Sequence, residues 1–178
     1  MAALFVAFPL CLFPLHIFGA QKQITVRFLD PKSGKPIRGM WVSVSQYKGD
    51  LPKGPIPAEY VVSTLNVQTD QNGEVAATLG DPLPAYIGVH SFDLWHSGPL
   101  IQVDEVLKSG AVLDYSGKGA PQDYWVDNQG HRSMESGSLL NHSDKKSAAT
   151  CKPVPEPGVI VFVEKKLTAW DKMRQEIP

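Results

Sequence analysis

The chain has 178 residues, of which 43% are hydrophobic and 20% are charged, and its formal net charge is -1. This length is sufficient for one domain with its own hydrophobic core. The nearly balanced charge lacks the basic surplus that proteins use to bind nucleic acids or anionic membrane surfaces. The 15 glycines and 15 prolines favour many short strands over a few long helices.

The N-terminal segment, residues 1–20, contains no Lys, Arg, Asp or Glu and ends in Gly19 and Ala20 before polar chain begins. This pattern predicts a secretory signal peptide, and therefore a secreted or periplasmic protein. An uncleaved N-terminal anchor is the alternative, because about 20 apolar residues can just span a bilayer. Pro9 and Pro14 argue against a regular membrane helix. After signal cleavage, residues 21–178 are expected to form a single domain without a membrane span.

The first half of this domain shows the alternation of apolar and polar residues that is typical of strands. Residues 23–30 and 40–47 both have this period of two, which predicts half-buried strands. Residues 60–69 and 74–79 are strand-like and flank an Asn-Gly pair, which predicts a β-hairpin. Residues 86–90 are predicted to form a further short strand.

The second half is less regular. Residues 99–108 fit either a strand or a short helical turn, and residues 111–115 fit a short strand. Residues 116–150 are polar and glycine-rich, which predicts a long loop insertion. Residues 158–164 are almost entirely apolar, as expected for a strand in the centre of a sheet. In residues 167–176 the apolar residues recur at helical spacing, which predicts a short C-terminal helix.

Together these elements predict an all-β protein, folded as an antiparallel β-sandwich. The pattern of strands around Gly34-Lys35-Pro36 and Thr69-Asp70-Gln71-Asn72-Gly73 resembles the carboxypeptidase-regulatory-like domains, which belong to the prealbumin-like and immunoglobulin-like sandwiches. Residues 81–84, 104–110 and 157–163 are similar to a group of exported bacterial proteins of unknown function, many from acidobacteria. The resemblance implies an immunoglobulin/prealbumin-like fold and export, but no activity, because a fold does not determine a function.

The cysteines restrict the chemistry further. Cys11 lies in the signal segment, so the mature chain contains Cys151 alone, without an intramolecular disulfide or a metal site built on cysteine pairs. The relatives suggested by the resemblance tend to have a second cysteine near the middle of the chain, which is absent here. The neighbouring Lys152 is expected to lower the pKa of the Cys151 thiol somewhat.

Aromatic residues in loop-like segments are the candidates for ligand binding, because an exposed aromatic side chain in a loop needs a reason to be there. The predicted ligand-binding residues are Trp95, His96, Tyr124 and Trp125. His90, Asp93 and His96 are also spaced so that they could supply three ligands to a metal ion. Because this spacing matches no established zinc motif, solvated or hydrogen-bonded loop side chains are the alternative interpretation.

The sequence lacks the Gly-x-Ser-x-Gly pattern of serine hydrolases. It therefore predicts a non-enzymatic, exported binding or scaffolding module of the cell envelope, without a cofactor. The expected partner is an envelope protein or a glycan, and not a nucleic acid. The contact surface is expected in loops 92–99 and 116–149. The alternative is a periplasmic metal-binding protein or hydrolase that uses His90, Asp93 and His96.

Overall fold

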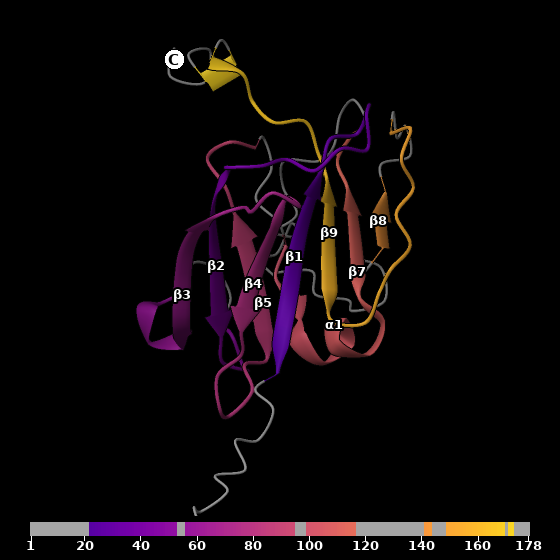
Figure 1. The fold of residues 1–178 in the computed structure, drawn as a ribbon. Helices are drawn as coiled ribbons and strands as arrows, with labels where there is room; N and C mark the ends of the chain where they lie inside the picture. Colours follow the sequence, from indigo (N-terminus) through magenta and orange to yellow (C-terminus); the bar gives the residue numbers. More distant parts are fainter. Residues whose placement is uncertain are drawn as a thin grey trace, which may run out of the picture.

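The computed structural model describes residues 22–52, 56–94, 99–116, 149–169 and 171–172, and the backbone of residues 141–143. These residues form mostly β-strands, arranged in two sheets that pack face to face as a sandwich (Figure 1). The predicted all-β sandwich is therefore confirmed. Within the described part of the chain, no helix is long and apolar enough to cross a membrane.

One sheet has five strands in the order β4-β1-β9-β7-β8. Its strands are β1 (Gln23–Leu29), β4 (Glu74–Thr78), β7 (Ala111–Asp114), β8 (Asn141–Ser143) and β9 (Val159–Val163). Only β1 and β4 pair antiparallel, whereas β1–β9, β9–β7 and β7–β8 are parallel. The expected fully antiparallel sandwich is therefore wrong for this sheet. The almost entirely apolar β9 lies between β1 and β7, as expected for a central strand.

The other sheet has four strands in the order β3-β2-β5-β6, and all of its pairs are antiparallel. Its strands are β2 (Trp41–Tyr47), β3 (Val61–Gln68), β5 (Tyr86–His90) and β6 (Ile101–Gln102). The turn predicted at Asn72-Gly73 is present, because Gly73 N–H donates to the carbonyl of Asp70 over 3.0 Å. The predicted hairpin pairing is wrong, since β3 pairs with β2 and β4 pairs with β1.

Two helical segments and a C-terminal turn complete the described part of the fold. Within the predicted loop insertion, residues 116–150, the backbone of residues 141–143 forms strand β8, so this part of the loop prediction is wrong. The ambiguous residues 99–108 contain both β6 and the helix α1 (Val103–Ser109), while the 3-10 helix η1 (Ala58–Tyr60) precedes β3. Near the C-terminus, Thr168 and Asp171 cap each other's backbone N–H groups, and Lys172 N–H donates to the Thr168 carbonyl. A helical turn therefore begins where the C-terminal helix was predicted. Residues 117–140, 144–148 and 173–176 lie outside the described part of the chain.

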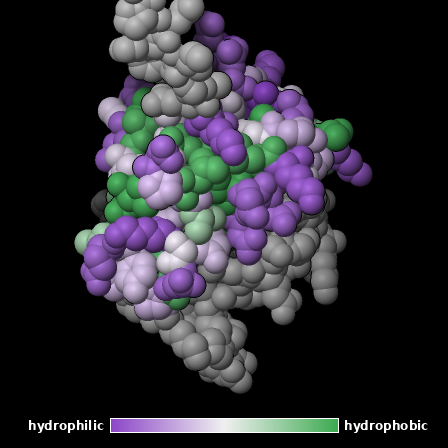
Figure 2. Space-filling model, turned by 90° about the horizontal axis from the view of Figure 1, so that it is seen from below, coloured by the Kyte–Doolittle hydropathy of each residue, from purple (hydrophilic) through white to green (hydrophobic). Residues whose placement is uncertain are grey.

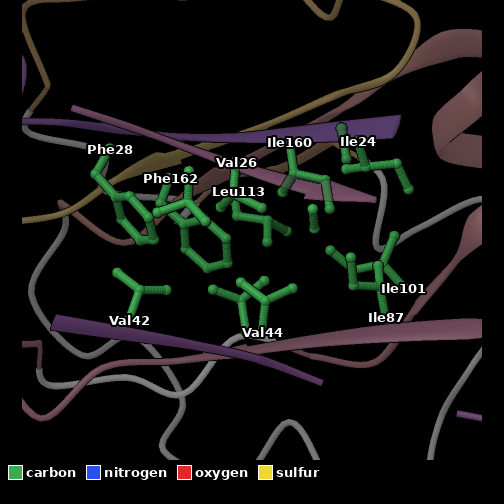
Figure 3. Packing of buried hydrophobic residues seen from close by; sticks show 14 of the residues in the cluster. Ile24, Val26, Phe28, Val42, Val44, Ile87, Ile101, Leu113, Ile160 and Phe162 are labelled. Atoms are coloured by element: carbon green, nitrogen blue, oxygen red, sulfur yellow. The ribbon is translucent and has the colours of Figure 1, made fainter. Parts of the chain in front are cut away.

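The core lies between the two sheets and follows the alternation seen in the sequence (Figure 3). Val26 and Phe28 of β1 face inward, opposite Val42 and Val44 of β2. The rings of Phe28 and Phe162 stack with their centres 5.1 Å apart. This continuous apolar layer fixes which face of β2 and β5 points inward, and consequently which side chains are presented on the outer face.

Candidate functional site

The outer face of β2 carries an exposed tryptophan. Val42 and Val44 are buried between the sheets, and because strand side chains alternate, Trp41 and Ser43 point away from the core. Trp41 is 58% exposed, although most tryptophans bury the greater part of their ring. The sheet therefore presents a large aromatic surface at the beginning of β2.

Neighbouring strands place polar side chains beside this tryptophan. In the antiparallel register, Ser43 is opposite Asn66 of β3 on one side and opposite His90 of β5 on the other. Residues opposite each other in a sheet share a face, so these three side chains form a row across the outer face. Burial lowers the pKa of His90 and so favours the neutral form of its imidazole. A neutral imidazole can both donate and accept a hydrogen bond.

A tight turn after β5 adds a second exposed aromatic side chain. Ser91 Oγ donates to the carbonyl of Trp41 over 2.7 Å and accepts from Asp93 N–H over 3.1 Å. These bonds fix the turn that carries Phe92, which is 81% exposed. The His90 ring meets the Phe92 ring edge to face, with their centres 4.8 Å apart. The turn therefore anchors Phe92 close to the start of β2.

These side chains enclose a groove of about 230 Å³ that we call the Trp41 groove; its lining is Trp41, Val42, Ser43, Asn66, His90, Ser91 and Phe92. Its exposed wall is almost entirely apolar, although the polar residues Ser43, Asn66, His90 and Ser91 are among those that line it. A few fixed polar groups within an aromatic surface are typical of sites that bind a ligand with one apolar face. The groove can therefore stack a flat or apolar surface, and it offers little polar surface for the hydroxyl or amide groups of a ligand.

The predicted ligand-binding residues Trp95, His96, Tyr124 and Trp125 lie outside the described part of the chain. The aromatic residues that the structure brings together are instead Trp41, His90 and Phe92. The signal for Trp41 was present in the sequence, because it shares the strand phase of the polar residues Ser43 and Ser45. The proximity of Trp41 to His90 depends on the β2–β5 register, which local sequence does not reveal.

The predicted metal ligands can be placed in part. The Asp93 carboxylate contacts Lys172 Nζ and lies 3.7 Å from Lys166 Nζ, while the Asp93 carbonyl accepts from Leu167 N–H over 2.8 Å. Asp93 thus attaches the segment after β9 to the turn after β5. His96 lies outside the described residues, so the three-ligand site stays a prediction. Among the described residues, no three His, Cys, Asp or Glu side chains could hold a metal ion together.

Cys151 lies beside the turn that follows β1, with its Sγ 3.8 Å from the carbonyl oxygen of Asp30. Burial raises the pKa of the thiol, and the carboxylates of Asp114 and Asp30 raise it further. The expected lowering by Lys152 is wrong, because burial and two nearby acidic groups favour the neutral thiol. Nucleophilic chemistry at neutral pH requires the opposite environment.

We therefore expect Cys151 in the folded protein to react with iodoacetamide at pH 8 about threefold or more slowly than a cysteine in an unstructured peptide. Peptide-resolved mass spectrometry of the 178-residue chain distinguishes Cys151 from Cys11. The chain unfolded in guanidinium serves as the control, in which the difference should disappear. A folded-state rate above that of the peptide would show that burial and the acidic neighbours do not raise the pKa of the thiol.

A second apolar surface lies at the end of the sandwich where β1 begins. Figure 2 shows apolar side chains gathered across the middle of this end. Leu83, in the connection between β4 and β5, is 45% exposed and lines a separate hollow of about 290 Å³ with Pro84, Ala85 and Val103 among others. Leu83 precedes β5 whereas Phe92 follows it, so Leu83 provides a control residue remote from the Trp41 groove.

Comparison of the chain with protein-family models, with curated proteins and with solved structures finds no match. The fold and the groove therefore define the class of this protein by themselves: a two-sheet β-sandwich with an aromatic groove on the outer face of its four-stranded sheet.

Proposed function

We propose that the protein is a non-enzymatic, exported binding module of the cell envelope, and that the Trp41 groove is its contact surface. The observation that carries the proposal is the exposure of two large aromatic side chains, Trp41 and Phe92, at one groove. Burying a large apolar side chain is worth about 1.5–3 kcal/mol. A partner that covers both rings would gain this stabilisation, which the isolated chain forgoes.

The fold and the N-terminal segment support this proposal. The two-sheet architecture and the turn at residues 70–73 agree with an immunoglobulin/prealbumin-like sandwich of the carboxypeptidase-regulatory-like type. In such sandwiches, binding surfaces commonly lie on loops and faces supported by a rigid core. The apolar residues 1–20 support export.

The composition of the groove favours a glycan as the ligand. One face of a sugar ring consists of C–H groups that stack on aromatic rings, while its hydroxyl groups need hydrogen-bond partners. Trp41 and Phe92 supply the first kind of contact. Ser43, Asn66 and His90 line the same groove and are the side chains that would supply the second, although they expose little polar surface to it. An apolar side chain of an envelope protein is the alternative occupant, and it would leave these polar groups unused.

The experiment is a glycan array with the purified protein, followed by affinity measurements for Trp41→Ala, Phe92→Ala and the control Leu83→Ala. We expect each groove variant to weaken binding by about tenfold or more, which corresponds to 1.4 kcal/mol per aromatic contact. The control should bind as the wild type does. Thermal unfolding of each variant verifies that it is folded.

Two results would contradict the proposal. The first is the absence of any glycan signal above that of an unrelated sandwich, together with no enrichment of a protein from envelope fractions. The second is a bound ligand whose affinity is the same in Trp41→Ala, Phe92→Ala and Leu83→Ala. In that case the contact surface would lie elsewhere.

A further inference from the structure

The outer edge of β3 ends the four-stranded sheet, and no strand of the described chain pairs with it. β3 has eight residues, whereas β6, at the other end of this sheet, has two. β4, at one end of the five-stranded sheet, has five residues and carries Glu74. β3 therefore offers the longest edge of these three terminal strands.

This edge lacks the features that normally prevent strand pairing. Residues 60–69 contain no charged residue and no proline, although natural edge strands are usually protected by lysine, proline or bulges. The register shift between β2 and β3 falls at Gln46/Tyr47, opposite the beginning of β3, and leaves its centre regular. Leu65 is 37% exposed, although it pairs with the buried Val44.

The hydrogen bonds at the end of β3 show which of its backbone groups face outward. Thr69 N–H donates to the Met40 carbonyl over 2.9 Å, and the Thr69 carbonyl accepts from Gly39 N–H over 3.0 Å. Thr69 therefore points its backbone groups toward β2. Because this direction alternates along a strand, Thr64, Asn66 and Gln68 point their N–H and C=O groups toward the open edge.

We propose that β3 pairs antiparallel with β3 of a second copy of this chain, which joins two four-stranded sheets into one sheet of eight strands. A two-fold axis at Asn66 places each Asn66 opposite its copy and each Thr64 opposite Gln68 of the other chain. These are hydrogen-bonded pairs with polar side chains on the outer face. Between them, Leu65 lies opposite Val67 of the other chain on the inner face.

Neither β3 strand carries a charged residue that would oppose the pairing. A strand without charges meets no like charge when it pairs with itself, whereas a lysine or glutamate on it would meet its own copy. The formal net charge of -1 adds little long-range repulsion between two chains. The pairing also covers Leu65, whose exposure has no other explanation within the described sandwich.

The pairing has a consequence that rests on the proposed function. The two-fold axis is perpendicular to the sheet, so both Trp41 grooves would open on the same face. The two β2 strands would be three strand spacings apart, or about 14 Å across the sheet. A repetitive glycan could then occupy both grooves and bind more tightly than a single sugar unit does.

The test measures the association state of the protein, expressed from the whole 178-residue sequence, by sedimentation velocity over a wide concentration range. Leu65→Lys and Leu65→Asp each introduce like charges near the axis, while Ala76→Lys places a lysine at an exposed position on the terminal strand β4. We expect dimers for the wild type and for Ala76→Lys. The dissociation constant should rise at least about tenfold in either Leu65 variant, and mixing the two variants should restore a dimer.

A wild-type chain that is monomeric at every concentration would overturn the proposal, as would Leu65 variants that dimerise like the wild type. A third result would also overturn it: the wild-type chain is monomeric and captures an envelope protein, and Leu65→Lys abolishes this capture. The edge of β3 would then bind a different partner. Binding of a single sugar unit by the Leu65 variants separates the two proposals. It depends on the Trp41 groove and not on β3 pairing.

Discussion

Replacing Gly110 by alanine should lower the free energy of unfolding by about 3 kcal/mol or more, whereas Gly39→Ala should cost only about 1 kcal/mol. Both glycines have positive φ angles, +73° at Gly110 and +64° at Gly39, which disfavour any side chain. The larger cost at Gly110 has two causes. A Cβ there would lie 2.0 Å from the Glu156 carbonyl oxygen, whereas no atom lies within 4 Å of a Cβ at Gly39. In addition, the ψ angle of 178° at Gly110 belongs to a backbone region that is essentially restricted to glycine.

The contact at Gly110 matters because it sets the position at which β9 begins. The carbonyl of Val106 accepts from Gly110 N–H over 2.9 Å and from Gly158 N–H over 2.8 Å. This joins the end of α1 to the residue before β9. Urea denaturation of the two variants measures their costs under identical conditions. Equal costs would mean that neither the close approach of Glu156 nor the backbone conformation of Gly110 requires glycine at this position.

The individual strands could be predicted because burial follows the local alternation. Ile24, Val26 and Phe28 are the inward-facing residues of β1, as their spacing indicated, and the apolar β9 lies in the centre of its sheet. In each case the physical cause is local: apolar side chains avoid water, and side chains alternate between the two faces of a strand. Both effects can be recognised within a few consecutive residues. The sequence alone is therefore sufficient to predict where these strands lie and which of their faces is buried.

The pairing of strands could not be predicted in the same way. The Asp70–Gly73 bond makes a tight turn, and Asp70 Oδ1 also accepts from the N–H groups of Asn72 and Glu74. This chemistry determines that the chain bends, but not which strands lie together afterwards. β3 and β4 continue into different sheets, and the parallel β1–β9 pair joins strands far apart in the sequence.

The candidate site depends both on local alternation, which could be predicted, and on strand pairing, which could not. The exposure of Trp41 follows from its phase in β2 and could have been predicted from the pattern of Ser43 and Ser45. The groove requires His90 to be opposite Ser43 and Phe92 to be held by Ser91, and both depend on a register between distant segments. The burial of Gln46 also depends on distant segments. Its side-chain amide donates to the carbonyl of Thr78, at the end of β4 in the other sheet, and accepts from Gly80 N–H.

Phe162→Ala is expected to lower the free energy of unfolding by about 3–5 kcal/mol, because it removes a fully buried ring from a close-packed core. Phe162 is 1% exposed and stacks on Phe28 in the parallel register of β1 and β9. Val154→Ala, at an exposed position, should change the stability by less than about 0.5 kcal/mol. Chemical denaturation measures both variants, and a loss below about 1.5 kcal/mol for Phe162→Ala would place this ring outside the core.

The double variant Phe28→Ala/Phe162→Ala tests the parallel pairing itself. If the two rings stack as described, their losses should not add, and the coupling free energy should be about 0.5–1.5 kcal/mol. Phe28→Ala combined with Val154→Ala provides the additive reference. Additive losses for the two phenylalanines would mean that β9 does not lie beside β1 in this register.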